Sequence, residues 1–170
     1  PITGEEIKML AQAAVPKMQE DDVYKGFTTL PPNAIEGDKK DLAEKKSLLD
    51  SAARKVTGLA RDLDGDGEPE LIGVVNFVAE GKDNASIEFN DSSIAILVVL
   101  KKTPAGGFFH HYSALNWEFG GKNEYNILGF IDFNGDGVDE IITFGLSSKN
   151  ETFGTSIHLS KGKGYILKEG

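Results

Sequence analysis

Residues 62–70 read DLDGDGEPE and residues 132–140 read DFNGDGVDE. The nine acids in these two stretches equal the whole acidic excess of the 170-residue chain, which has 27 Asp plus Glu, 18 Lys plus Arg and a net charge of −9. Carboxylates crowded in this way repel one another, which lowers stability unless a cation neutralises them. The two stretches therefore predict two cation sites of one design.

Calcium is the cation that best fits both stretches. It takes six to eight oxygen ligands and accepts carboxylate, amide and backbone carbonyl oxygens, whereas magnesium prefers an octahedral shell with few protein ligands. The glycine in the middle of each stretch, Gly67 or Gly137, permits the sharp turn that brings alternate side chains inward. The expected ligands are Asp62, Asp64, Asp66, the Glu68 carbonyl and Glu70 in the first stretch, and Asp132, Asn134, Asp136, the Val138 carbonyl and Glu140 in the second.

The second half of each stretch excludes an EF-hand. An EF-hand places a bidentate Glu at position 12 and a helix on each side, but here position 12 is Gly73 or Thr143 within a run of strand-forming residues. Ordinary hairpin turns at Asp64-Gly65 and Asn134-Gly135 are the alternative. A hairpin alone does not require oxygen-bearing side chains at positions 1, 3, 5 and 9 in both copies. Charge count predicts that the first site binds calcium more tightly than the second.

This pattern, D-x-[DN]-G-D-G-x-x-[DE] followed by an apolar run, resembles the FG-GAP and related VCBS repeats of integrin-type propellers and many secreted bacterial proteins. Both stretches match it at every ligand position. The resemblance implies a calcium ion held in a loop between two β-strands. It covers about 20 residues around each loop, and it implies no particular activity.

The rest of the chain predicts an α+β fold that is mostly β. From Val56 onward, about eight short apolar runs separated by turn residues form two sets of four. We expect N-terminal helices packed on two tandem four-stranded antiparallel meanders, each like a propeller blade. Two blades are too few to close a propeller. The expected parts of this one compact domain are a helical segment (1–56), a first calcium-loop repeat (57–126) and a second (127–170).

Two helices are predicted in the N-terminal segment. Thr3 and Glu6 fit a capping box, and Pro16 should end or kink the first helix near Val15. Asp38 is the expected N-cap of a second helix that runs to about Lys55. The expected apolar stripes are Ile7, Leu10, Ala11, Ala14 and Met18 in the first helix and Leu42, Leu49, Ala52, Ala53 and Val56 in the second.

Composition excludes several classes of function. The chain has no cysteine, so it has no disulfide or thiolate metal site. Its net negative charge argues against a nucleic-acid partner, and it has no apolar run of the roughly 18 residues that a membrane span needs. No H-E-x-x-H, G-x-S-x-G or Gly-rich phosphate-loop motif is present, although a pair of catalytic carboxylates is not excluded by sequence.

An aromatic region at residues 108–125 is the candidate surface for a protein or carbohydrate partner. Phe108, His110 and Tyr112 would share one strand face, and core packing with a solvent-exposed edge is the favoured interpretation of this region. Weak calcium sites fill where calcium is near millimolar, which favours a secreted, periplasmic or cell-surface location. The expected function is a calcium-binding extracytoplasmic β-repeat module with a binding or structural role. The alternatives are a secreted hydrolase with structural calcium ions and a regulatory or inhibitor subunit of a larger assembly.

Overall fold

The computed structural model describes residues 1–20, 30, 32–40, 43, 47, 53–78, 93–116, 123–147, 152–161 and 164–169. These residues form one long helix followed by eight strands, as the alternating sequence patterns predict. The elements are α1 (Gly4–Glu20), β1 (Ala53–Arg61), β2 (Glu70–Val78), β3 (Ser93–Lys102), β4 (Phe108–Asn116), β5 (Asn123–Ile131), β6 (Glu140–Ser147), β7 (Thr152–Lys161) and β8 (Gly164–Glu169).

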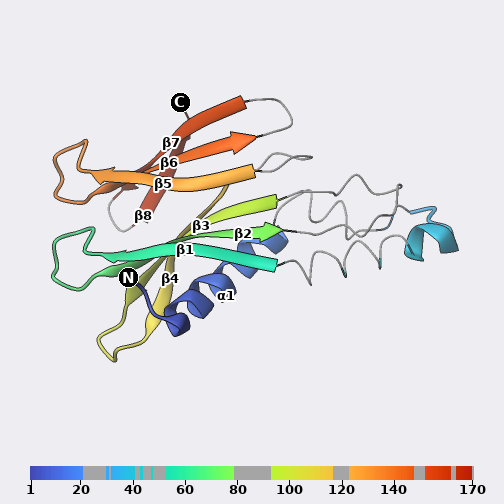
Figure 1. Cartoon of the computed structure of the whole chain (residues 1–170), viewed down its shortest axis with the longest axis horizontal. Helices are drawn as coiled ribbons and strands as arrows, with labels where there is room; N and C mark the ends of the chain where they lie inside the picture. The colour runs from blue at the N-terminus through green and yellow to red at the C-terminus, as the bar shows by residue number, and fades with distance from the viewer. Residues whose placement is uncertain are drawn as a thin grey trace.

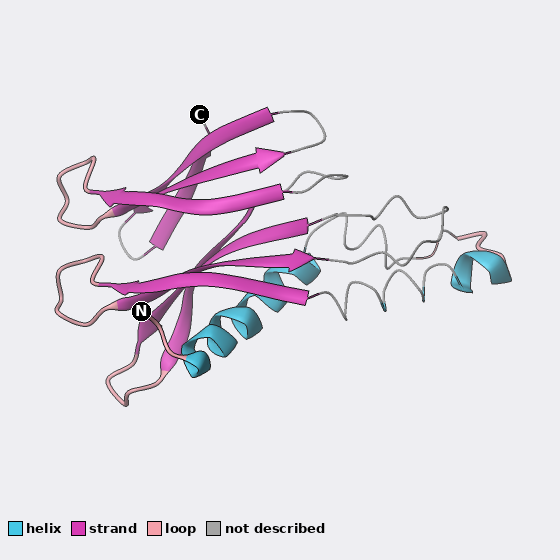
Figure 2. Cartoon of the chain, in the orientation of Figure 1, coloured by secondary structure: helices cyan, strands magenta, loops and turns pink. Residues whose placement is uncertain are grey.

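The strands form two antiparallel sheets of four, ordered β1-β2-β3-β4 and β5-β6-β7-β8. Each sheet is a meander in which consecutive strands are neighbours. The second sheet stacks on one face of the first, and α1 crosses the opposite face (Figure 1). Figure 2 shows the helix in cyan on the side of the first sheet that faces away from the second, with both sheets in magenta. The predicted class is therefore confirmed: a mostly β, α+β chain of two blade-like meanders that do not close into a propeller.

The first sheet has an apolar layer on each face because its central strands, β2 and β3, are apolar on both sides. Alternate residues point to opposite faces of a strand, so a continuous apolar run serves two layers. One layer lies between α1 and the sheet. Its residues are Leu10, Ala14 and Met18 from α1 and Leu71, Val75, Phe77, Ile96, Val98 and Leu100 from the sheet. The other lies between the sheets and contains Leu63, Ile72, Val74, Ala95, Leu97, Val99, Ala114 and Ile141.

Helix α1 begins as its sequence predicts. The Glu6 side chain accepts a hydrogen bond from the Thr3 amide at 2.6 Å, and the Thr3 hydroxyl accepts one from the Glu6 amide at 3.3 Å, which completes the capping box. The expected end near Val15 is wrong, because the helix continues through Pro16 to Glu20. Pro16 and Gln12, whose carbonyl loses its helical partner, are both exposed, so water can replace the missing hydrogen bond.

The second predicted helix differs from expectation at both ends. Residues 36–40 are helical, and the Asp38 carboxylate accepts a hydrogen bond from the Ile35 amide at 2.8 Å. Asp38 therefore lies inside the first turn of the helix, where its side chain caps the amide of the preceding Ile35, and it is not the N-cap residue. The helix does not reach Lys55, because β1 begins at Ala53 and pairs with β2. Of the predicted stripe, Leu42, Leu49 and Ala52 lie outside the described residues.

A β-bulge in β4 overturns the predicted aromatic face. Val99 pairs with Tyr112 whereas Leu100 pairs with His110, so His111 is an extra residue that reverses the alternation. Phe108 consequently packs in the layer beneath α1, and Tyr112 packs in the layer between the sheets. Phe109 stays 46% exposed, and residues 117–122 lie outside the described part of the chain.

Candidate metal centre

The two acidic stretches form equivalent loops, the first between β1 and β2 and the second between β5 and β6. They lie side by side at the same end of the stacked sheets (Figure 1). The Asp139 amide of the second loop donates to the Leu63 carbonyl of the first at 2.7 Å. The Arg61 guanidinium also donates to the Asp139 carboxylate, at 2.6 and 2.9 Å. Asp139 therefore ties the second loop to the first loop through its backbone amide and to the end of β1 through its side chain.

Each loop folds around its first aspartate. In the first loop, Asp62 accepts hydrogen bonds from the amides of Gly65 and Gly67 at 2.8 and 2.9 Å. In the second, Asp132 accepts them from Gly135 and Gly137 at 2.7 and 3.0 Å. These four glycines have positive φ values of 71° to 86°, a backbone conformation that other residues adopt only with strain. These hydrogen bonds and glycine conformations turn the backbone of each loop around its first aspartate.

The last acid closes each loop in the same way. The Glu70 carboxylate accepts the Leu63 amide at 2.8 Å, and the Glu140 carboxylate accepts the Phe133 amide at 2.7 Å. Both glutamates are almost completely buried, with 2% and 0% of their surface exposed. The glutamate that starts each strand is thus held by the backbone amide of the second residue of its own loop.

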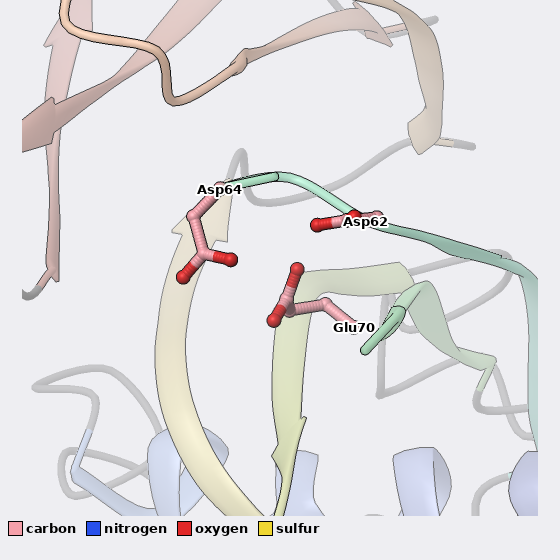
Figure 3. Close-up of side chains that lie close together, drawn as sticks. All are labelled: Asp62, Asp64 and Glu70. Atoms are coloured by element: carbon pink, nitrogen blue, oxygen red, sulfur yellow. The ribbon is translucent and has the colours of Figure 1, made fainter. Parts of the chain in front are cut away.

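Three carboxylates converge in the first loop. Ligand oxygens of Asp62, Asp64 and Glu70 all lie within 4.8 Å of one another, a grouping that could hold a metal ion. Figure 3 shows the three side chains, which approach from the two ends of the loop and point toward a common space. The sequence predicted all three as ligands, and the fold brings them together.

Glu70 is the most unusual of the three, because one of its oxygens is buried without a hydrogen bond. Its Oε2 accepts the Leu63 amide, whereas Oε1 has no hydrogen-bond partner. The nearest cationic group is the Lys101 ammonium, 3.4 Å from Oε1. Burial raises the pKa of Glu70 above its ordinary value, and the nearby Asp64 charge acts in the same direction. A cation at Oε1 would offset both effects.

Lys101, at the end of β3, enters the first loop. Its ammonium makes ion pairs with Asp64 and with Asp66, the latter at 3.0 Å, in addition to its approach to Glu70. The hydrogen bond to Asp64 raises the pKa of Lys101, so the side chain stays charged. The Asp66 pKa is lowered, first by a hydrogen bond from the Glu68 amide and then by Lys101. Lys101 therefore supplies one positive charge to three predicted ligands.

The second loop holds its acids together with an amide. The Asn134 side chain donates to Asp136 at 3.1 Å and to Glu140 at 3.3 Å, while its oxygen accepts the Asp136 amide at 2.8 Å. The predicted ligands Asp132, Asn134, Asp136 and Glu140 are thus linked in one hydrogen-bonded network. Ligation by Asn134 would require its amide oxygen to face the ion.

The two loops differ in what the third strand of each sheet places beside them. Leu71 pairs with Leu100 in the first sheet, and Ile141 pairs with His158 in the second. By this register the positions of Lys101 and Lys102 are taken by Leu159 and Ser160. The second sheet therefore has no basic residue at the positions that bring cations to the first loop.

The remaining predicted ligands are backbone carbonyls, and their side chains turn elsewhere. The Glu68 carboxylate pairs with Lys102 at 2.8 Å, on the exposed side of the loop. The amides of Glu68 and Val138 donate to Asp66 and Asp136 at 2.8 and 2.9 Å. Calcium ligation by these two carbonyls stays a prediction.

Sequence reasoning missed Lys101, Arg61 and Asp139. Lys101 lies 31 positions after Glu70 in the chain, and only the pairing of β2 with β3 brings it to the loop. A comparison of the two repeats could have singled out Arg61 and Lys101, because the corresponding residues of the second repeat, Ile131 and Leu159, are apolar. No helix among the described residues combines the length and hydropathy needed to cross a membrane.

No family model matches the chain, and neither the curated proteins nor the solved structures give a match.

Proposed function

We propose that this protein is a calcium-binding extracytoplasmic β-repeat module with a binding or structural role. The observation that carries the proposal is Glu70: a buried carboxylate that lies close to Asp62 and Asp64 and whose Oε1 has no hydrogen-bond partner. A buried carboxylate oxygen without a hydrogen bond costs stability. A divalent cation bound at that oxygen would recover the cost and neutralise the surrounding acids.

The donor set favours calcium over other divalent ions. Every candidate side-chain ligand in both loops presents oxygen, and the chain has no cysteine, so soft metals have no preferred ligand here. Flexible loops that offer several carboxylates together with backbone carbonyls suit the large, irregular shell of calcium better than the octahedral shell of magnesium. We propose one calcium ion in each loop.

The proposed location is supported by the design of the sites. Both loops are short and largely exposed apart from their closing glutamates, and in the first loop an ion must displace Lys101. Both features favour weak sites, which fill only where calcium is near millimolar. We therefore place the protein outside the cytoplasm. In the three-layer fold, calcium would stabilise the end of the molecule where the two sheets meet.

The deciding experiment uses Glu70→Gln, with Glu68→Gln as its matched control. Both substitutions remove one negative charge from the same loop, but only Glu70 points inward. Thermal melting should show that excess EDTA destabilises the wild type and Glu68→Gln relative to millimolar calcium. Glu70→Gln should melt no lower than the wild type in EDTA and should gain much less from calcium. A melting temperature that is the same in EDTA and calcium for the wild type would refute the proposal.

A further inference from the structure

One backbone hydrogen bond joins the two acidic loops directly. The Asp139 amide of the second loop donates to the Leu63 carbonyl of the first at 2.7 Å. Leu63 is 3% exposed and belongs, together with Ile141, to the apolar layer between the sheets. A hydrogen bond beside such a layer is stronger than one in open solvent. A change in the backbone of one loop at this point therefore acts on the other loop.

The acceptor end of this bond lies among proposed ligands of the first ion. Leu63 stands between Asp62 and Asp64 in the sequence. The Leu63 amide donates to Glu70 Oε2 at 2.8 Å. The other oxygen of that carboxylate, Oε1, is buried without a hydrogen bond and is the proposed contact for the ion. An ion in the first loop would therefore fix the residues on both sides of Leu63 and the carboxylate that holds its amide.

The donor end shares a peptide group with a proposed ligand of the second ion, the Val138 carbonyl. A trans peptide group is planar, and its N–H and C=O bonds point in opposite directions. While the Asp139 amide is bonded to Leu63, the Val138 carbonyl consequently points away from the first loop in a fixed direction. Leu63 thus sets the orientation of an oxygen that we propose for the second calcium ion.

An ion pair supports the same junction. Arg61 donates to the Asp139 carboxylate at 2.6 and 2.9 Å, and its guanidinium lies 4.9 Å from the centre of the Phe130 ring. Arg61 also directly precedes Asp62, the first position of the first loop. The junction therefore has a side-chain part and a backbone part, and these can be removed separately.

The first loop has no donor that corresponds to the Asp139 amide. Position 8 of the nine-residue stretch is Asp139 in the second loop and Pro69 in the first, and proline has no amide hydrogen. The loops nevertheless turn alike, because in each one the central aspartate accepts the amide two residues later, at 2.8 and 2.9 Å. This loop conformation therefore accepts proline at position 8.

We propose that the two loops bind calcium cooperatively, and that the hydrogen bond from Asp139 to Leu63 couples them. The inference rests on the proposed function, since it needs an ion in each loop. Filling the first loop fixes Leu63 and so orients the Val138 carbonyl before the second ion arrives. The second ion then has less of its loop to order and binds more tightly. Because coupling is reciprocal, the second ion tightens the first site by the same factor.

Repulsion between the two ions acts against this coupling. A divalent ion in one loop makes the neighbouring loop less attractive to a second cation. Salt screens exposed charges over about 8 Å at physiological ionic strength, but it does not change the orientation of a peptide group. Cooperativity should therefore rise with salt concentration. Sites that are linked through charge alone would oppose each other and approach independence in high salt.

The deciding experiment compares Asp139→Pro with Asp139→Ala at physiological ionic strength. Both substitutions remove the carboxylate that pairs with Arg61, but only proline removes the amide hydrogen. Calcium titrations followed by NMR at the Gly137 amide report the affinity of the second loop, with the first loop intact or inactivated by Asp66→Ala. In Asp139→Ala, inactivation should weaken the second loop about fivefold. In Asp139→Pro, it should change that affinity by less than about twofold.

Hydrogen exchange gives a second test that needs no substitution at Asp139. In Asp136→Ala, calcium should bind the first loop alone, and it should slow exchange of the Asp139 amide. The Gly137 amide is the internal control, because it donates to Asp132 within the second loop at 3.0 Å. Its exchange should change far less than that of Asp139.

The outcomes distinguish failure of the coupling from failure of the proposed function. A wild type that binds no calcium refutes the proposed function. Two loops that bind calcium, with a second-loop affinity that Asp66→Ala leaves unchanged in the wild type and in Asp139→Ala, refute the coupling alone. Equal coupling in Asp139→Pro and Asp139→Ala would show that the amide is not the link. If Asp139→Pro does not fold, the exchange measurement decides, and an Asp139 amide indifferent to calcium overturns the proposal.

Discussion

The Lys101 ammonium lies 3.0 Å from the Asp66 carboxylate, so the protein itself supplies a cation to the first acidic loop. Lys101 also pairs with Asp64 and lies 3.4 Å from Glu70. These are the side chains that we propose as calcium ligands, so the lysine and the metal compete for the same oxygens. Leu159 stands at the corresponding position of the second sheet.

The first prediction is that Lys101→Met tightens calcium binding at the first loop. The ammonium must leave before a divalent ion can take the three carboxylates, and its ion pairs are lost when it does. Methionine keeps most of the length of the side chain without the charge. Calorimetry on the Asp136→Ala background, which isolates the first loop, should show about a tenfold tighter dissociation constant, or about 1.4 kcal/mol.

The matched control for this prediction is Lys102→Met. Lys102 is the neighbouring residue on β3, and it pairs with the Glu68 carboxylate outside the cluster. Lys102→Met removes the same charge from the same strand as Lys101→Met, so any general electrostatic effect would appear in both variants. Equal tightening by both variants would show that Lys101 acts through net charge and not through direct competition.

The second prediction concerns stoichiometry. Asp66→Ala and Asp136→Ala each remove the central acid of one loop. In the wild type, the Asp66 and Asp136 carboxylates also accept hydrogen bonds from the amides of Glu68 and Val138. Each substitution should therefore remove one calcium equivalent in calorimetry and leave the other. Two equivalents remaining after either change would mean that the central aspartates are not ligands. In the wild type, the larger number of carboxylates favours tighter calcium binding by the first loop, whereas competition from Lys101 weakens binding there.

The third prediction is a loss of stability between pH 7 and pH 5 caused by His158. This histidine is fully buried between the sheets, and its two ring nitrogens lie 2.9 Å from the Tyr112 hydroxyl and 3.0 Å from the Thr143 hydroxyl. Burial lowers the pKa of His158 to about 4. As the pH falls below about 6.5, the unfolded chain binds a proton that the folded chain does not accept until about pH 4, so folding loses stability across that window.

The expected loss is roughly 2 kcal/mol of the free energy of unfolding between pH 7 and pH 5. Urea denaturation at the two pH values measures it directly. His158→Gln should flatten the dependence, while His110→Gln, at an exposed position on β4, should leave it in place. If His158→Gln keeps the full slope, other groups account for the pH dependence.

The sequence predicts the elements and their order because the signals for them are local. Thr3 and Glu6 lie one helical turn apart, and the alternation that defines each strand extends over fewer than a dozen residues. The glycines at fixed places in the two loops predict their turns for the same reason. The inward grouping of Asp62, Asp64 and Glu70 follows, since a nine-residue loop has few ways to arrange these side chains.

What sequence alone does not predict depends on contacts between distant strands. The bulge at His111 moves Phe108 and Tyr112 to opposite faces, because β3 and β4 accommodate one extra residue. The arrival of Lys101 at the first loop likewise depends on the register of β2 with β3. Proline is disfavoured inside helices, yet Pro16 is accommodated because burial of Met18 in the next turn favours continuation of α1.

The last prediction tests how α1 docks on the first sheet. Gly58 and Gly73 face each other across β1 and β2, and the Leu10 side chain of α1 packs over them. A Cβ atom at Gly58 would lie 2.7 Å from the Ile72 carbonyl oxygen and 3.0 Å from a Leu10 methyl group. The first contact is with backbone, so Gly58→Ala must displace β2 or shift the helix, and we expect a cost of about 1–3 kcal/mol in stability.

Gly129→Ala is the control, because Gly129 occupies the adjoining register in the second sheet and a Cβ there meets nothing within 4 Å. Alanine restricts the unfolded chain more than glycine does, so this substitution should be neutral or slightly stabilising. Gly73→Ala should fall between the two, since its closest clash, 2.5 Å, is with a movable methyl group of Leu10. Urea denaturation ranks the three variants. A Gly58→Ala protein as stable as Gly129→Ala would mean that the paired glycines are not what lets α1 approach the sheet.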